Sequence, residues 1–255
     1  MKYVLGVSYD GTDFAGWQIQ KNGRTVQGVL EQAALEIFRK EIKIKGSGRT
    51  DAGVHAHFQV CEFEAETSVP AEKIRECFNR ILPTDVSVLK SAAAPEGFDC
   101  TRAARKKTYC YRAYYAEYPL PLFERYEARL KNKIDTQRMR KAAELLIGRH
   151  DFKAFSATGS SAKTSEREIY SIVIRENADG RDAVHYEIEV CGNGFLYNMV
   201  RIIAGELFGI GSGKGDGAIK KALETGKREL LAKTMPAKGL ALLNTEYGIN
   251  LFENE

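Results

Sequence analysis

The sequence has 255 residues, enough for one or two domains with a sizeable hydrophobic core. Its composition, 44% hydrophobic and 28% charged residues, excludes a disordered or fibrous chain. The five cysteines are an odd number without a CxxC pair, which argues against a disulfide framework and favours a reducing, cytoplasmic location. No apolar run approaches the ~18 residues of a membrane span, so no membrane association is expected.

The net charge of +4 is distributed unevenly along the chain. Residues 100–141 contain twelve Lys and Arg against four Asp and Glu, a net charge of +8, which leaves −4 on the rest. A basic zone on a near-neutral body suggests a polyanionic partner such as a nucleic acid. A solvated charged face would have the same composition, so charge alone leaves both interpretations open.

The first part of the chain predicts the element order β-α-β-β-α-β. Alternating apolar residues indicate strands, and apolar residues at helical spacing indicate two helices with recognisable starts. The expected elements are strands at 3–9, 42–46, 57–64 and 86–88, and helices beginning after Thr25 and at Pro70.

The second part repeats this order, with an Asp179-Gly180 turn between its two central strands. Two such units predict an α+β fold of two ferredoxin-like halves, residues 1–97 and 98–255, each an antiparallel sheet with helices on one face. The opposite sheet face is expected to be free, where RNA-binding versions of this topology place their aromatic residues. The expected elements are strands at 107–116, 170–174, 184–190 and 240–247, and helices after Asp135, from about 195 and near 216–225.

Two stretches resemble ligand-binding motifs only superficially. The glycine-rich stretch 209–217 lacks Ser or Thr after Lys214 and has no preceding strand, so a helix end and a turn are expected there rather than a phosphate loop. His55, His57 and Cys61 match no zinc spacing, so no metal site is expected. No dinucleotide fingerprint and no nucleophile elbow occur, and no cofactor is expected.

The loop between residues 46 and 56 presents Arg49 and Asp51 between two expected strands. Its three glycines allow the backbone to turn sharply and to approach a ligand closely. A turn aspartate that hydrogen-bonds its own backbone would have the same setting. The loop by itself therefore leaves the role of Asp51 open.

Two further stretches combine reactive side chains in a regular pattern. Residues 106–112 interleave cations with Tyr109 and Tyr111, which share one strand face and could stack on bases or pack against a helix layer. Farther on, Arg201 shares one helix side with Asn198 and Gly205, and a glycine there lets another backbone come close. Such an arginine is either a surface residue or a buried partner of a carboxylate.

Together these stretches resemble the TruA family of tRNA pseudouridine synthases. The resemblance implies one continuous antiparallel sheet, an active-site cleft between the halves, no cofactor and a homodimer. It implies a tRNA substrate in which anticodon stem-loop uridines, at positions 38, 39 or 40, are isomerised. The resemblance covers essentially the whole chain, with matching stretches at Tyr9–Gln18, Gly48–Ala56 (the most specific), Lys107–Tyr111, Gly148–Phe152, Asn193–Gly205 and Gly239–Leu242.

The same resemblance implies roles for four residues. Asp51 matches the nucleophile, and Arg201 matches the arginine that is paired with it. Tyr109 matches the tyrosine that stacks on the target base, and Arg49 matches a residue that helps to flip this base. Many members have an arginine where this chain has Thr101, so the RNA contacts there are expected to differ.

The reaction leaves two chemical routes and two other functions open. The carboxylate either attacks C1′ of the nucleotide or removes the C2′ proton, and the base must leave its stack to be reached. Burial disfavours an ionised carboxylate, and a nearby arginine counters this effect. The same residues also fit a noncatalytic RNA-binding module of this fold, or a pseudouridine synthase with a different RNA target.

Overall fold

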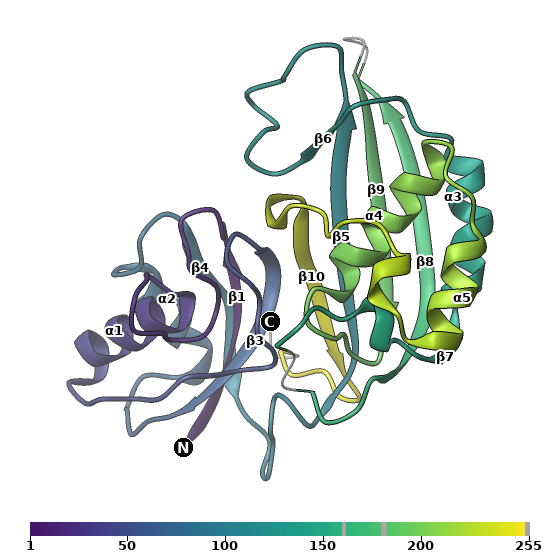
Figure 1. Ribbon diagram of the computed structural model, residues 1–255. Coiled ribbons are helices and arrows are strands. Elements are labelled where there is room, and N and C mark those ends of the chain that lie inside the picture. Colours follow the sequence, from purple (N-terminus) through teal and green to yellow (C-terminus); the bar gives the residue numbers. More distant parts are fainter. Residues whose placement is uncertain (160–161, 180–182, 253–255) are drawn as a thin grey trace. The chain divides into compact units, whose positions relative to one another are not determined.

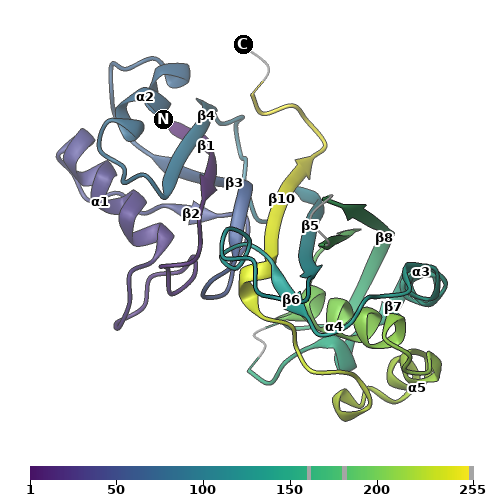
Figure 2. The ribbon, with the colours of Figure 1, turned by 90° about the horizontal axis from the view of Figure 1, so that it is seen from above.

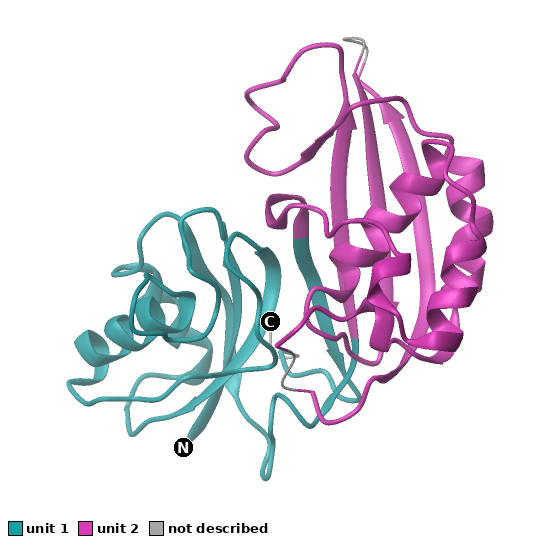
Figure 3. Cartoon of the chain, in the orientation of Figure 1, with its two compact units in different colours: residues 1–106, 241–255 teal, residues 107–240 magenta. Residues whose placement is uncertain are grey.

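The computed structural model describes residues 1–159, 162–179 and 183–252. Contacts divide the chain into two compact units, which are described one at a time below. Unit 1 comprises residues 1–106 and 241–255, and unit 2 comprises residues 107–240 (Figure 3). These units differ from the expected halves at two places, because residues 98–106 and residues 241–255 belong to unit 1. The last strand pairs there with a strand of that unit.

Unit 1 contains the β-α-β-β-α-β order that the sequence predicts, followed by a strand from the end of the chain (Figure 1). The side chain of Thr25 accepts a hydrogen bond from the Gly28 N–H at 3.2 Å, which confirms the expected helix cap. The elements are β1 (Lys2–Tyr9), α1 (Val26–Phe38), β2 (Lys45–Gly46), β3 (His55–Glu64), a 3₁₀ turn (Ala71–Lys73), α2 (Ile74–Asn79), β4 (Val86–Ala93) and β10 (Leu240–Tyr247).

The sheet of unit 1 has the strand arrangement of a ferredoxin-like half. Strand β1 lies between β3 and β4 and is antiparallel to both, and β2 is antiparallel to β3. Strand β10 pairs in parallel with the first residues of β3, Ala241 opposite His55 and Leu242 opposite Ala56. Helices α1 and α2 lie together on one side of these strands (Figures 1 and 2).

The face of this sheet opposite the helices is covered. On that face, residues from β1 and β3 pack against the chain segment after β4 and the chain segment after β10, and together they form a small hydrophobic core. The expectation of a free face is therefore wrong for unit 1, because two chain segments fold back over it. This core consists of Val4, Val60, Phe98, Cys100 and Leu251.

Unit 2 follows the order strand, helix, two strands, helix, with two short additional strands, β6 before the first helix and β7 after it. The helix α3 is capped as expected, since the Asp135 carboxylate accepts from the N–H groups of Gln137 and Arg138. The expected turn between the two long strands includes Gly180, which lies outside the described residues. The elements are β5 (Ala104–Tyr115), β6 (Ala128–Leu130), α3 (Thr136–Ala143), β7 (Gly148–Asp151), β8 (Glu166–Ala178), β9 (Val184–Gly192), α4 (Met199–Gly211) and α5 (Gly217–Thr225), with 3₁₀ turns at Glu144–Leu146, Lys153–Phe155, Arg228–Leu230 and Ala237–Gly239.

The strands β5, β9, β8 and β7 are consecutive antiparallel neighbours, and the short β6 runs parallel to β5. Helices α3, α4 and α5 lie on one side of this sheet (Figure 2). Helix α4 begins at Met199 rather than near 195, because Asn198 has a left-handed φ of 61° that cannot continue a helix backward.

These elements confirm the α+β class and the antiparallel sheets with helices on one side. The prediction that a single sheet continues through both halves concerns the junction of the units and stays a prediction. Within the described part of the chain, none of the helices is both long and apolar enough to cross a membrane.

Candidate active site

The loop that carries Asp51 connects β2 to β3 in unit 1 and is anchored on both sides of Arg49. The Tyr9 hydroxyl lies 2.7 Å from the Thr50 hydroxyl and donates to Gln59 Oε1 at 3.1 Å. The amide of Gln59 in turn donates to the Gly48 carbonyl at 2.9 Å. A buried tyrosine and a buried glutamine therefore hold the Thr50 side chain and the Gly48 carbonyl, the groups on either side of Arg49.

The segment after β1 packs against the same loop through its backbone. The Trp17 N–H donates to the Thr50 carbonyl at 3.1 Å, and the Gly53 N–H donates to the Phe14 carbonyl at 3.2 Å. Gly16 has a φ of +99°, and a Cβ added there would lie 2.7 Å from the Thr50 carbonyl oxygen. The sequence match at residues 9–18 thus has a structural reason, because this stretch shapes the Asp51 loop.

The structure places the two candidate residues of this loop differently. Asp51 is half-buried and Arg49 is exposed. The Asp51 carbonyl accepts from the Val54 N–H at 3.1 Å, which closes a turn that continues through Gly53 with a φ of +77°. The backbone of Asp51 therefore makes the turn, and this turn leads directly into β3.

The histidines near the loop are not arranged as a metal site. His55 is buried and its Nδ1 accepts from the Gly11 N–H at 3.0 Å, whereas His57 is exposed. Across the described ranges of the chain, no group of three or more His, Cys, Asp or Glu side chains could hold a metal ion. His55 instead connects the end of β1 to the start of β3.

The two tyrosines on one face of β5 have different surroundings in unit 2. Tyr111 is fully buried, packs edge-on against Phe208 of α4 and donates to the Pro236 carbonyl at 2.8 Å. Burial raises the pKa of its phenol, and the nearby positive charge of Arg201 opposes this. Of the two alternatives, stacking on a base or packing against a helix layer, Tyr111 therefore follows the second and is a core residue.

Tyr109 lies two residues earlier and is only half-buried. Its ring meets the edge of Phe195 with the two centroids 5.2 Å apart. Phe195 belongs to the segment that leads into α4, which therefore supports the Tyr109 ring from one side.

Arg201 is half-buried in the first turn of α4 and is held within unit 2 by two short bonds. Its Nη1 donates to Asn198 Oδ1 at 2.7 Å, and its Nε donates to the Met235 carbonyl at 2.7 Å. A Cβ on Gly205 would lie 2.3 Å from the Lys233 carbonyl oxygen, which confirms the expected close approach of another backbone. That backbone is the segment 231–236, which we call the strap.

The strap is fastened to α4 by a buried carboxylate. Glu206 is fully buried and accepts from the Ala232 N–H at 2.7 Å and from Lys214 Nζ at 2.8 and 2.9 Å. Lys214 reaches back to it because α4 ends at Gly211 and a turn with a φ of +111° at Gly213 follows. The expectation of a helix end and a turn at 209–217 is confirmed.

A family model described as tRNA pseudouridine synthase matches residues 6–101 and 142–248, which include every candidate residue except Tyr109. The chain belongs to this family. It is therefore a pseudouridine synthase, an isomerase, which confirms the resemblance seen in the sequence.

Curated relatives are similar over nearly the whole chain. A protein of Thermoanaerobacter sp. (strain X514) named tRNA pseudouridine synthase A is 38% identical over 245 residues, covering 96% of this chain and 98% of the relative. One of Limosilactobacillus reuteri (strain DSM 20016) with the same name is 40% identical over 255 residues, covering 98% of each. Another with this name, from Pelobacter propionicus (strain DSM 2379), is 40% identical over 244 residues, covering 95% of this chain and 98% of the relative.

Thr101, the position at which the sequence analysis expects different RNA contacts, has a local role in this synthase. Its hydroxyl donates to the Gly46 carbonyl at 3.2 Å, and its N–H donates to Asp99 Oδ1 at 3.0 Å. The neighbouring Arg102 is exposed, and its Nε lies 3.9 Å from Asp99 Oδ2. Thr101 thus braces the start of the Asp51 loop, and a cation is available one residue later.

The acids of the basic segment are mostly used inside unit 2. Glu124 accepts from Lys238 Nζ at 2.7 Å and also from the Tyr114 hydroxyl, and the Lys238 bond holds its pKa below the ordinary range. Glu127 lies 2.8 Å from Nδ1 of His185. Asp135 caps α3. The segment also exposes cations, among them Lys131 and Lys133, whereas Arg112 is bonded to Glu187 at 2.8 Å.

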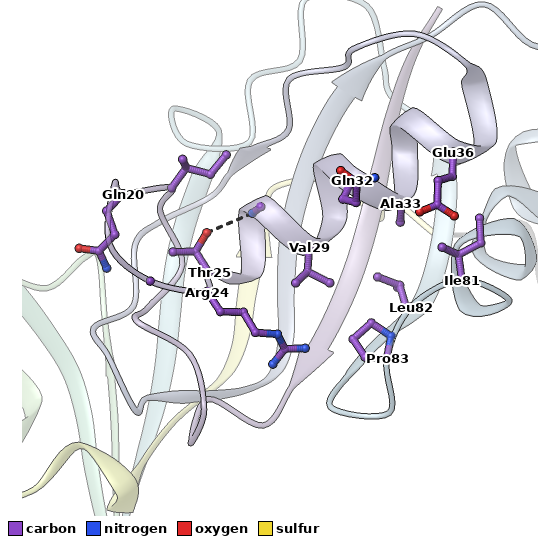
Figure 4. Close-up of a pocket in the computed structure, with 13 residues that line it drawn as sticks. Gln20, Arg24, Thr25, Val29, Gln32, Ala33, Glu36, Ile81, Leu82 and Pro83 are labelled. Carbon is purple, nitrogen blue, oxygen red and sulfur yellow. Dashed lines mark hydrogen bonds between the residues drawn. The ribbon is translucent and has the colours of Figure 1, made fainter.

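A hollow of about 390 Å³ in unit 1 is separate from the Asp51 loop (Figure 4). It lies between the start of α1 and residues 81–83, and none of the described residues of the Asp51 loop lines it. Arg24 at its rim is bonded to Asp85 at 2.5 and 2.9 Å and lies 4.1 Å from the centroid of the Phe14 ring. These contacts attach the residues before α1 to the segment that contacts the Asp51 loop.

Proposed function

We propose that this synthase isomerises uridines in the anticodon stem-loop of tRNA, at the positions given above, with Asp51 as the catalytic carboxylate. The observation that carries the proposal is the anchored loop, in which Gln59 holds the Gly48 carbonyl and Tyr9 holds the Thr50 side chain, one on each side of Arg49. A carboxylate that reacts at a sugar carbon needs such a fixed position. The 38–40% identity with relatives named tRNA pseudouridine synthase A supports the substrate.

In the proposed reaction the N1–C1′ bond of uridine breaks, the uracil turns, and a C5–C1′ bond forms. The proton on C5 is lost and N1 gains one, so the product is an isomer and no oxidant or group donor is required. For this reason we propose that the synthase works without a cofactor. Asp51 acts at the sugar, either by attack on C1′ or by removal of the C2′ proton.

Arg201 is the proposed partner of the carboxylate. A planar guanidinium can hold a carboxylate through two parallel hydrogen bonds and favours its ionised form in a dry site. Its attachment to Asn198 and to the strap supports this role, because an arginine that holds another group must itself be held. The proposal requires the Arg201 guanidinium to contact the Asp51 carboxylate during the reaction.

The remaining two residues act on the target base, which must leave its stack. Tyr109 stacks on the flipped base, and its half-buried ring supported by Phe195 is suited to this contact. Arg49 occupies the space that the base leaves, and its exposure next to Asp51 in the loop supports this assignment. The exposed cations of residues 100–141 bind tRNA phosphates.

We further propose that the synthase acts as a homodimer in the cytoplasm. The homodimer follows from the family resemblance, and the cytoplasm from the five cysteines without a disulfide framework. Sedimentation of the purified protein, with and without tRNA, tests the oligomeric state.

The decisive experiment is incubation of the wild-type protein and Asp51→Asn with unmodified tRNA transcripts, followed by chemical labelling and mapping of pseudouridine. A label is needed because the product has the mass of uridine. We expect label in the anticodon stem-loop with the wild type, none with Asp51→Asn, and similar tRNA affinity for both. Comparable activity of the two proteins would exclude Asp51, and label only outside the anticodon stem-loop would exclude the proposed target.

A further inference from the structure

The guanidinium of Arg201 is fixed by bonds at two of its nitrogens. Nε donates to the Met235 carbonyl and Nη1 donates to Asn198 Oδ1, both at 2.7 Å. The nitrogens of a guanidinium lie in one plane, so two bonds to separate anchors set the orientation of the whole group. Asn198 and the strap therefore constrain the direction in which Arg201 presents its guanidinium.

Asn198 has an unusual setting for a residue at a helix start. Asparagine at such a position usually accepts a hydrogen bond from the backbone of the first turn. Here its φ is 61°, and its side chain makes no capping bond to a described N–H of α4. The side-chain oxygen is used instead for Arg201, one turn along the helix.

The second anchor is held independently of the Arg201 side chain. The strap is bonded to α4 through Glu206 and Ala232, and the Tyr111 hydroxyl donates to the Pro236 carbonyl at 2.8 Å. Met235 lies between these two attachments, and its N–H donates to the Arg201 carbonyl at 3.3 Å. The carbonyl that receives Arg201 Nε thus belongs to a segment that is fixed at both ends.

We propose that Asn198 is a positioning residue for Arg201, with the Met235 carbonyl as the opposite anchor. The inference rests on the proposed function, in which Arg201 holds the catalytic carboxylate. Asn198 acts through Arg201 and touches neither the base nor the sugar. Removal of its side-chain oxygen frees one end of the guanidinium and lowers the fraction of molecules in which Arg201 points correctly.

The substitution Asn198→Gly separates positioning from a merely structural role. Glycine adopts a positive φ readily, so the turn before α4 is retained while the acceptor is lost. A structural role therefore predicts unchanged kcat. Positioning predicts a kcat about 10- to 100-fold lower with KM for tRNA unchanged, the scale of losing a hydrogen bond to a charged group.

Two further variants complete the test. Asn198→Asp keeps an acceptor at the same place and tolerates the left-handed φ, so kcat is expected to recover most of the loss. Arg39→Gly changes the other described non-glycine residue with positive φ, 56° at the end of α1, and is expected to leave kcat and KM at wild-type values. Equal loss of kcat in Asn198→Gly and Asn198→Asp, or wild-type kcat in Asn198→Gly, overturns the proposal.

A measurement without substrate keeps the inference distinct from the proposed function. The order parameter of the Arg201 Nε–H group, measured by ¹⁵N NMR relaxation and assigned by loss of its signal in Arg201→Lys, is expected to fall in Asn198→Gly. If the wild type makes no pseudouridine in tRNA, the proposed function fails, and this order parameter still decides the inference. An unchanged order parameter in Asn198→Gly overturns it.

Discussion

The substitution Gly16→Ala tests whether the segment after β1 holds the Asp51 loop in place. A side chain at position 16 meets two penalties in the folded state. The φ of +99° is strained for any residue with a Cβ, and the added Cβ lies 2.7 Å from the Thr50 carbonyl oxygen, well inside ordinary contact. The Thr50 backbone must therefore move, and it carries Asp51 with it.

The magnitude follows from these two penalties. Left-handed backbone costs about 1–2 kcal/mol for a residue other than glycine. Overpacking against a fixed backbone costs about 1–3 kcal/mol. The free energy of unfolding is thus expected to fall by about 2–5 kcal/mol, a large fraction of the roughly 5–15 kcal/mol of a typical protein.

The control for this substitution is Gly97→Ala, in the same unit. Gly97 has a φ of +69°, but no described atom lies within 4 Å of its added Cβ, so only the strain of about 1–2 kcal/mol applies. Urea unfolding followed by the fluorescence of Trp17, the single tryptophan, reports on unit 1 in both variants. Gly16→Ala is expected to be less stable than Gly97→Ala and, unlike it, to lose most of its kcat while still folded. Equal stability and equal kcat of the two variants would show that contact with residue 16 does not position the loop.

Four further outcomes are expected. Arg201→Lys lowers the single-turnover rate constant by about 100-fold, because an ammonium lacks the planar pair of N–H donors that a guanidinium offers to a carboxylate. A wild-type rate constant would refute the pairing of Arg201 with Asp51. Tyr109→Phe keeps the stacking ring, so tRNA affinity in a filter-binding titration stays at the wild-type level, whereas a large loss would assign binding to the hydroxyl. The double variant Lys131→Glu/Lys133→Glu lowers tRNA affinity and reduces the slope of log binding constant against log salt concentration by about 0.9 per lost duplex phosphate contact. An unchanged slope would show that these lysines face only solvent. Glu206→Gln weakens the bonds that fasten the strap, so the free energy of unfolding in urea is expected to fall by about 2 kcal/mol and kcat is expected to fall as well. A wild-type kcat in this variant would show that the strap does not contribute to catalysis.

The parts of the fold that depend on local rules were predictable from sequence. The caps at Thr25 and Asp135 and the alternation of strands and helices arise from neighbouring residues, so they appear in the sequence pattern. The covered sheet face of unit 1 was not predictable in this way. It depends on Phe98 and Leu251, which are far from β1 in sequence and show no periodicity that would place them there.

The site residues required the family resemblance, since composition left both Asp51 and Arg201 ambiguous. What sequence did not reveal is the structure that supports them. The Asp51 loop is anchored by the Tyr9 hydroxyl and the Gln59 amide. In the sequence, Tyr9 and Gln59 look like ordinary residues of two strands. The one available signal was the pair Asn198 and Gly205 on the same helix side as Arg201, and both have proved to be part of its surroundings.

The parallel pairing of β10 with β3 has a consequence for how the protein is made. Residues 241–242 lie beside His55 and Ala56, the first residues after the Asp51 loop, and almost three-quarters of the chain separates these partners. A ribosome therefore releases the Asp51 loop long before the strand that borders it. Unit 1 can close only after the residues of unit 2 have been synthesised, so an incomplete chain that ends within unit 2 carries Asp51 without the finished sheet around it.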